Sequence, residues 1–251
     1  MRKALIGHTG FLGGNLAAQT AFSHSYNSKN ISQIEGEHFD LVICGGVTAT
    51  KWWANQNPAE DRTRIDSLLR HLSTVRAERF VVLSTVDVYP VLQNVTESFD
   101  CASARNHPYG SNRLYFEQAV RAIFPQVTVV RISGVVGPGL KKNVIFDLMH
   151  DNCLDAIQPG SSFQYYNAAN LWQDMQRILA AEIPLVNLAS EPVPTARLAA
   201  RLFPHKSIGK NAAAPVHYDI RTQHTKFFSG SSYRTTEEEI VTEIGRFAHC
   251  I

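Results

Sequence analysis

The sequence has almost no excess of charge of either sign. Its 251 residues include 24 basic and 22 acidic side chains, which leaves a formal net charge of +2. Lysine and arginine are spread along the chain and form no basic stripe of the kind that binds a phosphate backbone. We therefore expect no nucleic-acid partner.

Long apolar runs are missing as well. The N-terminal segment "MRKALIGHTG" starts with basic residues, but glycine ends its apolar run after "ALI". That run is shorter than the apolar core of a signal peptide, and none elsewhere approaches membrane-spanning length. The sequence thus predicts a cytoplasmic protein that does not associate with membranes.

Cysteine and histidine are present but never grouped. The four cysteines show no CxxC spacing, and the ten histidines show no HExxH spacing. We expect a reduced protein without a metal site. A hydrophobic content of 44% is enough for a real core in one large domain, or in one domain with a small appendage.

The first 150 residues alternate short apolar runs with helix-like stretches. This alternation is typical of a parallel sheet with crossover helices, and it predicts an α/β fold with a Rossmann-type doubly wound parallel sheet. The predicted strands cover residues 3–7, 39–46, 79–89 and 127–133. The predicted helices cover residues 11–22, 59–77 and 108–123.

The pattern is weaker in the last hundred residues. It predicts helices over "VIFDLMHD", "NLWQDMQRILAAE", "VPTARLAARLF" and "TTEEEIVTEIGRFAHC", the last capped by Thr235 or Thr236. Short strands are predicted over "FQYY" and "PLVNLAS", and mostly loop over 206–234. We expect a dinucleotide-binding domain at 1–140. Residues 141–251 would form a small substrate-binding region and a C-terminal helix, packed on the first domain as one globular unit.

A glycine-rich loop, "GHTGFLGG", joins the first predicted strand to the first predicted helix. Glycines in that setting make a tight turn, let the backbone approach a pyrophosphate, and let the helix pack close to the sheet. The helix N-terminus adds free N–H groups for the phosphates. A glycine-rich turn without a ligand is the alternative. The predicted cofactor contacts of this loop are Gly7, Thr9, Gly10, Phe11, Leu12 and Gly13.

The carboxylate that binds a ribose in NAD-specific Rossmann units is missing. It is expected about 20 residues after the first glycine, but residues 25–30 read "SYNSKN" and the first acidic residue is Glu35. The hydroxyl of Ser28, the ammonium of Lys29 and the amide of Asn30 all suit a 2′-phosphate. An ordinary surface turn has the same composition. The hypothesis is a site for NADP in preference to NAD.

Four further segments follow in order. They are "CGGVTA" (44–49), "LSTVDVY" (83–89), "YGSNR" (109–113) and "RISGVVGPG" (131–139). With "TGFLG" they resemble the extended short-chain dehydrogenase/reductase family, which includes the NAD-dependent epimerases and dehydratases, although Val136 replaces a usual tyrosine. The resemblance implies oxidoreductase or epimerase activity and cofactor contacts by Cys44, Gly45 and Gly46.

The resemblance also assigns the catalytic groups. Thr85 would hydrogen-bond the substrate oxygen, unless its hydroxyl only caps a turn. Tyr109 would be the general acid/base, and Arg113 takes the place of the family's usual lysine in YxxxK. Both Tyr109 and Arg113 would also contact the cofactor.

The residues themselves support a role for this pair. The phenol of free tyrosine has a pKa of about 10, so a nearby cation is needed to favour the phenolate near neutral pH. Helical spacing puts Arg113 on the face of Tyr109. Arginine is longer and planar, so it is not a conservative replacement for lysine. Arg113 either completes an active pair at the nicotinamide ribose or faces solvent in a protein that binds NADP without turnover.

Three residues are candidate substrate contacts. Asp87 stands where the family's dehydratases carry an acidic residue, but Val86 replaces the second acid, so reductase or epimerase chemistry fits better. Asp87 is otherwise a turn carboxylate. Lys142 and Asn143 follow Lys141 at a predicted helix start and suit an anionic substrate. A solvated helix start would look the same.

The sequence therefore favours an NAD(P)-dependent enzyme acting on a sugar-nucleotide-like or other polyhydroxylated carbonyl substrate. A catalytically silent NADP sensor on the same fold is the alternative. The expected partner is a small-molecule substrate. Family resemblance also suggests a homodimer through helices around 60–77 and 108–123.

Overall fold

The computed structural model describes residues 1–249, which form two compact units that interleave along the chain. The sheet unit contains residues 1–90, 99–131 and 169–186, and the second unit contains 91–98, 132–168 and the residues from 187 onward. The chain thus leaves each unit and returns to it more than once.

The sheet unit is built on six strands in the order β10-β6-β4-β3-β1-β2. The strands are β1 (Lys3–Ile6), β2 (His24–Tyr26), β3 (His38–Cys44), β4 (Arg76–Thr85), β6 (Val127–Ile132) and β10 (Leu185–Leu188). β1 pairs in parallel with both β2 and β3, and β3 pairs in parallel with β4. The predicted doubly wound sheet is confirmed. The strand order reverses between β1 and β3, where such sheets bind ligands at the carboxyl ends of their strands.

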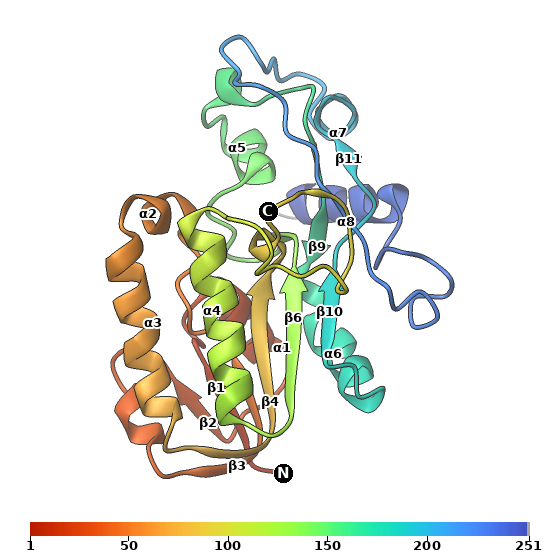
Figure 1. Ribbon diagram of the computed structural model, residues 1–251. Helices are drawn as coiled ribbons and strands as arrows, with labels where there is room; N and C mark the ends of the chain where they lie inside the picture. The colour runs from red at the N-terminus through yellow and green to blue at the C-terminus, as the bar shows by residue number, and fades with distance from the viewer. Residues whose placement is uncertain (250–251) are drawn as a thin grey trace. The chain divides into compact units, whose positions relative to one another are not determined.

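Helices cover the sheet. α3 (Pro58–Leu72) packs beside α4 (Pro108–Ile123), as Figure 1 shows, and α1 (Phe11–Gln19) packs against α6 (Leu171–Ala180). The core beneath α3 and α4 joins Ile65 and Phe116 of the helices to Val42 and Phe80 of the strands. Strands buried in this way read as continuous apolar runs, which is why the sequence revealed them.

The predicted bounds differ from the observed ones mainly around β4. The predicted helix 59–77 ends at Leu72, and the predicted strand 79–89 starts earlier, at Arg76, and ends at Thr85. A 3-10 turn, η2 (Val86–Val88), follows it, and another, η1 (Ile31–Ile34), lies between β2 and β3. A short helix, α2 (Lys51–Gln56), was not predicted, because six residues are too few to show a helical period.

Up to His249, the second unit contains short strand pairs and three α-helices. β7 (Gly134–Val136) pairs with β9 (Tyr165–Asn167), β8 (Ser162–Phe163) with β11 (Val193–Pro194), and β5 (Gln93–Val95) with β12 (Asp219–Ile220). The helices are α5 (Val144–His150), α7 (Thr195–Leu202) and α8 (Glu237–His249). They bury Ile145, Leu198 and Ile244 in a common core.

The predicted cap of the last helix is confirmed at Thr236. Its backbone N–H donates to Glu239 Oε2 at 2.9 Å, and the Glu239 N–H donates back to Thr236 Oγ1 at 3.2 Å. This reciprocal pair is a capping box. Cys250, which ends the predicted helix, lies outside the described residues.

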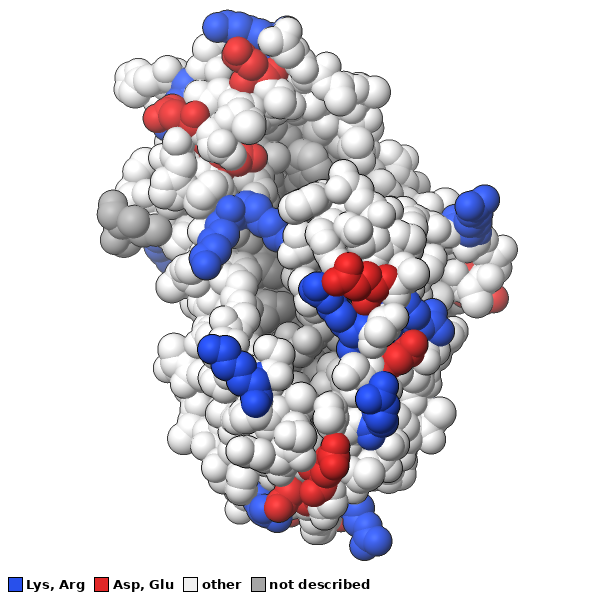
Figure 2. Space-filling view, turned by 90° about the vertical axis from the view of Figure 1, so that its left-hand side faces the viewer, with Lys and Arg blue, Asp and Glu red and all other residues white. Residues whose placement is uncertain are grey.

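Charge on the displayed face is mixed. Figure 2 shows acidic and basic side chains side by side rather than one continuous basic surface. Within residues 1–249, no helix combines the length and apolar character that crossing a bilayer requires.

Candidate active site

The glycine loop after β1 has the geometry its sequence predicts. Gly7 has a φ of +86°, and a Cβ there would lie 2.6 Å from the Gly45 carbonyl oxygen. A Cβ on Gly13 would collide with the Gly7 carbonyl. The first glycine is therefore required by the turn, and the last by the close packing of α1 on that turn.

The same loop leaves room for a phosphate. Gly10 is the N-cap of α1, no side chain caps the helix, and a Cβ on Gly10 would meet only the Gly7 carbonyl oxygen, at 3.2 Å. Thr9 and Gly10 are exposed. N–H groups of the first turn, which contains Phe11 and Leu12, are therefore open to an anion. The residues present fit a dinucleotide pyrophosphate.

The turn after β2 holds the residues expected at a 2′-phosphate. Ser28 and Lys29 are exposed. The Asn30 amide instead braces the turn, because its Nδ2 donates to Ser25 O at 3.1 Å and its Oδ1 accepts from Asn27 N at 2.7 Å. Ser28 and Lys29 are thus the side chains of this trio that extend from the turn.

The end of β3 lies at the reversal of strand order. Cys44 is buried, and burial raises the pKa of its thiol to about 12. Gly45 N donates to Ile6 O at 2.9 Å, which ties the end of β3 to the end of β1. The Cys44 thiol is therefore packed in the core and un-ionised. Gly45 and Gly46 follow it and lie next to Gly7 of the glycine loop.

The start of α4 is pressed onto the end of β4. His107 caps the helix by accepting from Gly110 N at 3.0 Å, and Asn55 of α2 accepts from Tyr109 N at 2.9 Å. A Cβ on Gly110 would collide with the Asp87 carbonyl oxygen. The glycine after Tyr109 is therefore what lets the helix approach η2.

Tyr109 is buried next to the end of β4. Burial raises the pKa of its phenol to about 12. The positive charge of Arg113 and a hydrogen bond with the Thr85 side chain lower that pKa, whereas the carboxylates of Asp87 and Asp61 raise it. The phenol is therefore protonated at neutral pH.

Thr85 and Asp87 lie beside this phenol. The Thr85 hydroxyl accepts from Asp87 N at 3.2 Å and caps η2, so the turn-capping role is real. A hydrogen bond with the same side chain also lowers the pKa of the Tyr109 phenol. Asp87 Oδ1 accepts from Lys51 Nζ of α2 at 2.8 Å. The carboxylate is thus part of an ion pair.

Arg113 lies on the Tyr109 face of α4, with its guanidinium carbon 4.2 Å from the Tyr109 ring centroid. The expectation of a shared face is confirmed, and the alternative of a solvent-facing arginine is wrong, because Arg113 is 5% exposed. Its two terminal nitrogens both bond the Asp61 carboxylate of α3, and one also donates to Thr48 O. Asn112 Nδ2 donates to the same carboxylate at 2.8 Å.

A second buried ion pair was missed by the sequence reasoning. Glu117 of α4 accepts from Arg131 of β6, with Nη2 to Oε2 at 2.7 Å, and Ser84 also donates to Glu117. Arg131 Nη1 lies 3.5 Å from Cys101 Sγ. The spacing of Tyr109, Arg113 and Glu117 was the available signal, because residues four apart share a helix face.

The second unit holds the other tentative substrate residues. Lys142 is exposed, and the Asn143 side chain caps α5 by accepting from Phe146 N at 3.0 Å. Asn143 Nδ2 also donates to Val135 O at 3.0 Å. The Asn143 amide is thus committed to the backbone around it. In the sheet unit Trp52 is exposed, and the guanidinium carbon of Arg64 lies 4.2 Å from the centroid of the Trp53 ring.

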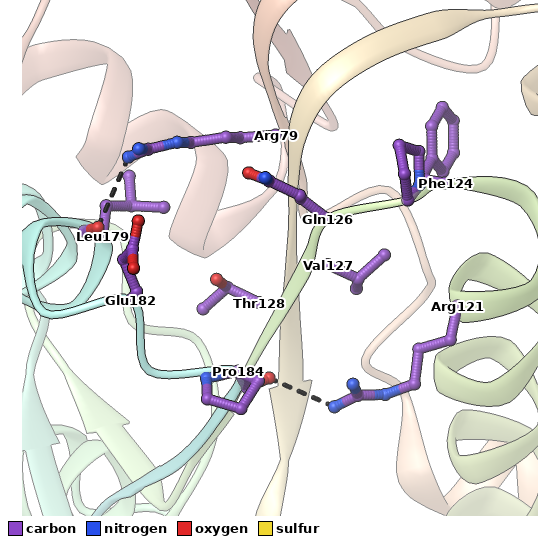
Figure 3. A pocket seen from close by; sticks show the side chains of 10 residues that line it. Arg79, Arg121, Phe124, Gln126, Val127, Thr128, Leu179, Glu182 and Pro184 are labelled. Carbon is purple, nitrogen blue, oxygen red and sulfur yellow. Dashed lines mark hydrogen bonds between the residues drawn. The ribbon is translucent and has the colours of Figure 1, made fainter.

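A cavity of about 380 Å³ opens at the other end of the sheet unit, where β6 begins. Figure 3 shows Arg79 and Arg121 on two sides of it. Arg79 donates to Leu179 O at 3.3 Å, and Arg121 donates to Pro184 O at 3.1 Å. Arg79 thus links β4 to α6, and Arg121 links α4 to the segment before β10, at the opposite end of β4 from Thr85.

Comparison with known structures agrees with the fold. RMD from Pseudomonas aeruginosa, solved in complex with NADPH, is 16% identical, covers 100% of both chains and has a TM-score of 0.74. The dTDP-4-dehydrorhamnose reductase from Yersinia enterocolitica is 14% identical over 99% of both chains, with a TM-score of 0.73. The UDP-glucose 4-epimerase from Thermotoga maritima, solved with UDP-glucose, is 11% identical over 99% of this chain and 98% of its own, with a TM-score of 0.73.

No curated protein matches the chain. The family description that matches is "NAD dependent epimerase/dehydratase family", over residues 25–156, which is more than half of the chain. The match starts after the glycine loop and includes Thr85, Tyr109 and Arg113, so it is independent of the loop that suggested a dinucleotide. The chain belongs to the NAD dependent epimerase/dehydratase family, whose members are enzymes that use a nicotinamide cofactor.

Proposed function

We propose that the protein is an NAD(P)-dependent oxidoreductase or epimerase that uses Tyr109 as its acid/base, with reduction of a carbonyl as the favoured direction. One observation carries the proposal: Tyr109 is buried where the start of α4 packs on η2, which the Thr85 hydroxyl caps at the carboxyl end of β4. Tyr109, Thr85 and Asp87 thus belong to the edge at which doubly wound sheets bind ligands, which supports a substrate site there.

The protonation state of Tyr109 suits reduction. Bound cofactor would supply a hydride to the carbonyl carbon of the substrate. Tyr109 then gives its proton to the oxygen, and the phenolate regains a proton from solvent. A phenol whose pKa is raised to about 12 carries that proton at neutral pH. The Thr85 hydroxyl donates a hydrogen bond to the same oxygen as negative charge develops there.

The sheet unit offers a fitting place for the cofactor. The uncapped first turn of α1 would hold the pyrophosphate, and Gly7 lets the end of β3 lie close to the glycine loop. Lys29 and Ser28, exposed after β2, would bind a 2′-phosphate, and no acidic residue precedes Glu35 to bind a free ribose hydroxyl. These features support NADP in preference to NAD.

The substrate class follows from the family and from the structures of similar fold. They include a dTDP-4-dehydrorhamnose reductase and a UDP-glucose 4-epimerase with UDP-glucose bound. A nucleotide-linked sugar, or a similar polyhydroxylated carbonyl compound, is therefore the proposed substrate. Lys142, exposed in the second unit, stays a proposed contact for the anionic part.

A silent NADP-binding sensor is the second candidate, and one observation favours it. The Arg113 guanidinium is already satisfied by Asp61 and Thr48, so it is not a free replacement for the usual lysine. A sensor would bind NADPH as tightly as an enzyme does, but it would never oxidise it.

The deciding experiment follows NADPH absorbance while nucleotide-linked keto sugars and simpler polyhydroxylated carbonyl compounds are added. Turnover by the wild-type protein that is lost in Tyr109→Phe supports the enzyme. Tight NADPH binding without turnover of any compound favours the sensor. Turnover that survives in Tyr109→Phe would refute the assigned proton carrier.

A further inference from the structure

A histidine, His8, lies inside the glycine loop, between Gly7 and Thr9, and is half-buried. Its Nδ1 lies 3.0 Å from the carbonyl oxygen of Tyr26, the last residue of β2. The Gly7 N–H donates to the same oxygen at 2.8 Å. The glycine loop and the end of β2 are therefore joined through one carbonyl, and one of the two bonds comes from a side chain.

The bond to Tyr26 O determines which nitrogen of the imidazole stays open. A carbonyl oxygen can only accept, so the Nδ1 of His8 carries the hydrogen. Nε2 then holds the lone pair of the neutral ring, and it becomes a donor when the ring is protonated. In the part of the chain that the structure describes, residues 1–249, the His8 ring makes no other hydrogen bond or ion pair.

The imidazole joins the two segments to which the proposed cofactor site assigns phosphates. His8 and Thr9 lead into the uncapped first turn of α1, which would hold the pyrophosphate. Tyr26 leads into the turn that carries the exposed Ser28 and Lys29, which would hold the 2′-phosphate. In NADP a single ribose links these two groups. That ribose must therefore cross the region between the two segments, where His8 lies.

The other ionisable groups around His8 leave room for an anion. α1 has none, while the end of β2 and its turn contribute Tyr26 and Lys29, and the end of β3 contributes Cys44. Burial raises the pKa of the Tyr26 phenol and of the Cys44 thiol, so both are un-ionised at neutral pH. The remaining groups lie near the amino ends of β1, β2 and β3, and they are Lys3, His24, His38 and Asp40. Within these described elements, no carboxylate lies at the edge where a phosphate would bind.

We propose that His8 binds the 2′-phosphate of NADPH, with Nε2 donating to a phosphate oxygen beside Lys29. The inference rests on the proposed preference for NADP, and it concerns binding alone. Histidine changes its charge near neutral pH, whereas a phosphate monoester is already mostly a dianion at about pH 7.5. The ring therefore takes up a proton as NADPH binds. NADH has no 2′-phosphate and causes no such uptake.

The test measures proton uptake by isothermal calorimetry in buffers of different ionisation enthalpy. At about pH 7.5 the wild-type protein should take up a fraction of a proton, up to about one, with NADPH and none with NADH. Because binding consumes a proton, NADPH affinity should fall as the pH rises from about 6.5 to about 8.5, by up to about tenfold per pH unit. NADH affinity should stay constant over the same range.

One variant separates phosphate binding from the structural bond to β2. His8→Asn places an amide nitrogen close to the position of Nδ1, so it can still donate to Tyr26 O, but it has no counterpart of Nε2. It should lower NADPH affinity by about five- to thirtyfold, remove the proton uptake and leave NADH affinity unchanged. His38→Asn is the matched control, because His38 is an exposed histidine near Glu78 at the amino end of β3. It should change neither affinity.

The proposal is overturned if the wild-type protein shows no preference for NADPH or takes up no proton when it binds NADPH. It is also overturned if His8→Asn binds NADPH as tightly as the wild-type protein does. An equal loss of NADPH and NADH affinity in His8→Asn would overturn it as well, since His8 would then only hold the loop against β2. Proton-linked, selective NADPH binding by a protein that reduces no carbonyl compound would uphold His8 and reject the proposed enzyme. The two failures are therefore distinguishable.

Discussion

Arg113 and Asp61 are almost fully enclosed, whereas Lys51 keeps 39% of its side chain exposed next to Asp87. Both pairs consist of one cation and one carboxylate, but it is the Arg113 guanidinium that lies against the Tyr109 ring. A buried pair resists separation because a lone charge in the interior costs several kcal/mol. An exposed pair contributes little to stability, since water screens it.

The buried pair fixes α4 against α3 and keeps the Tyr109 ring in place. Arginine at position 113 is thus explained by its contacts with both oxygens of the buried Asp61 carboxylate.

The largest effect should come from breaking the buried pair. Asp61→Asn leaves the Arg113 guanidinium without a counterion and should lower the free energy of unfolding by about 3–5 kcal/mol. Urea denaturation measures it. Asp66→Asn, on the exposed side of the same helix, is the control and should cost about 1 kcal/mol or less. Equal losses in the two variants would erase the contrast between the pairs.

A group that contacts Tyr109 but belongs to neither pair tests the site directly. Thr85→Val removes the hydroxyl and should lower turnover by roughly 10²-fold, which corresponds to about 2.7 kcal/mol. NADPH affinity should stay close to that of the wild-type protein. Thr63→Val, which removes an exposed hydroxyl on α3, is the matched control. Near-normal turnover in Thr85→Val would remove Thr85 from the mechanism.

Exchanging the two kinds of cation sharpens the comparison. Arg113→Lys cannot bond both oxygens of Asp61 together with Thr48 O, so it should lower the free energy of unfolding by about 2 kcal/mol. Lys51→Arg keeps its charge at a half-exposed position and should stay within about 0.5 kcal/mol of the wild-type protein. If Arg113→Lys is as stable as Lys51→Arg, the bidentate contact with Asp61 does not matter for folding.

The smallest effect is expected at a lysine outside both pairs. Lys29→Met should weaken NADPH binding by about five- to thirtyfold, the loss of one charged hydrogen bond worth roughly 1–2 kcal/mol. NADH binding should not change, because NADH has no 2′-phosphate. Fluorescence titration with both cofactors measures the ratio. Equal affinity of the wild-type protein for NADPH and NADH would contradict the assignment of this turn.

What the sequence predicted well was local. Gly7, Gly10 and Gly13 of the loop after β1 stand within seven residues, so their spacing already implied the turn that the positive φ of Gly7 confirms. Tyr109 and Arg113 are four residues apart in one helix, and their shared face is confirmed. Backbone geometry alone fixes how residues a few positions apart lie in one turn or helix, so their spacing in the sequence was enough to predict these features.

What the sequence could not predict was long-range. Asp61 and Arg113 are 52 residues apart, and Lys51 and Asp87 are 36 apart, so only the packing of α2, α3 and α4 brings them together. Asp61 appeared as one of several acids in an amphipathic helix. The short α2, which carries Lys51, has no periodicity of its own. Ion-pair partners that only tertiary packing brings together cannot be recognised from the spacing of residues along the sequence.

The central claim is that Tyr109 carries the proton in an NAD(P)-dependent reaction. The most direct measurement compares turnover and NADPH affinity in the wild-type protein and in Tyr109→Phe, with a nucleotide-linked keto sugar that the wild-type protein reduces. The account predicts at least a roughly 10³-fold loss of turnover with little change in the NADPH dissociation constant, because the ring and its packing against Arg113 remain. Turnover that persists, or is lost only in proportion to a loss of NADPH binding, would contradict it.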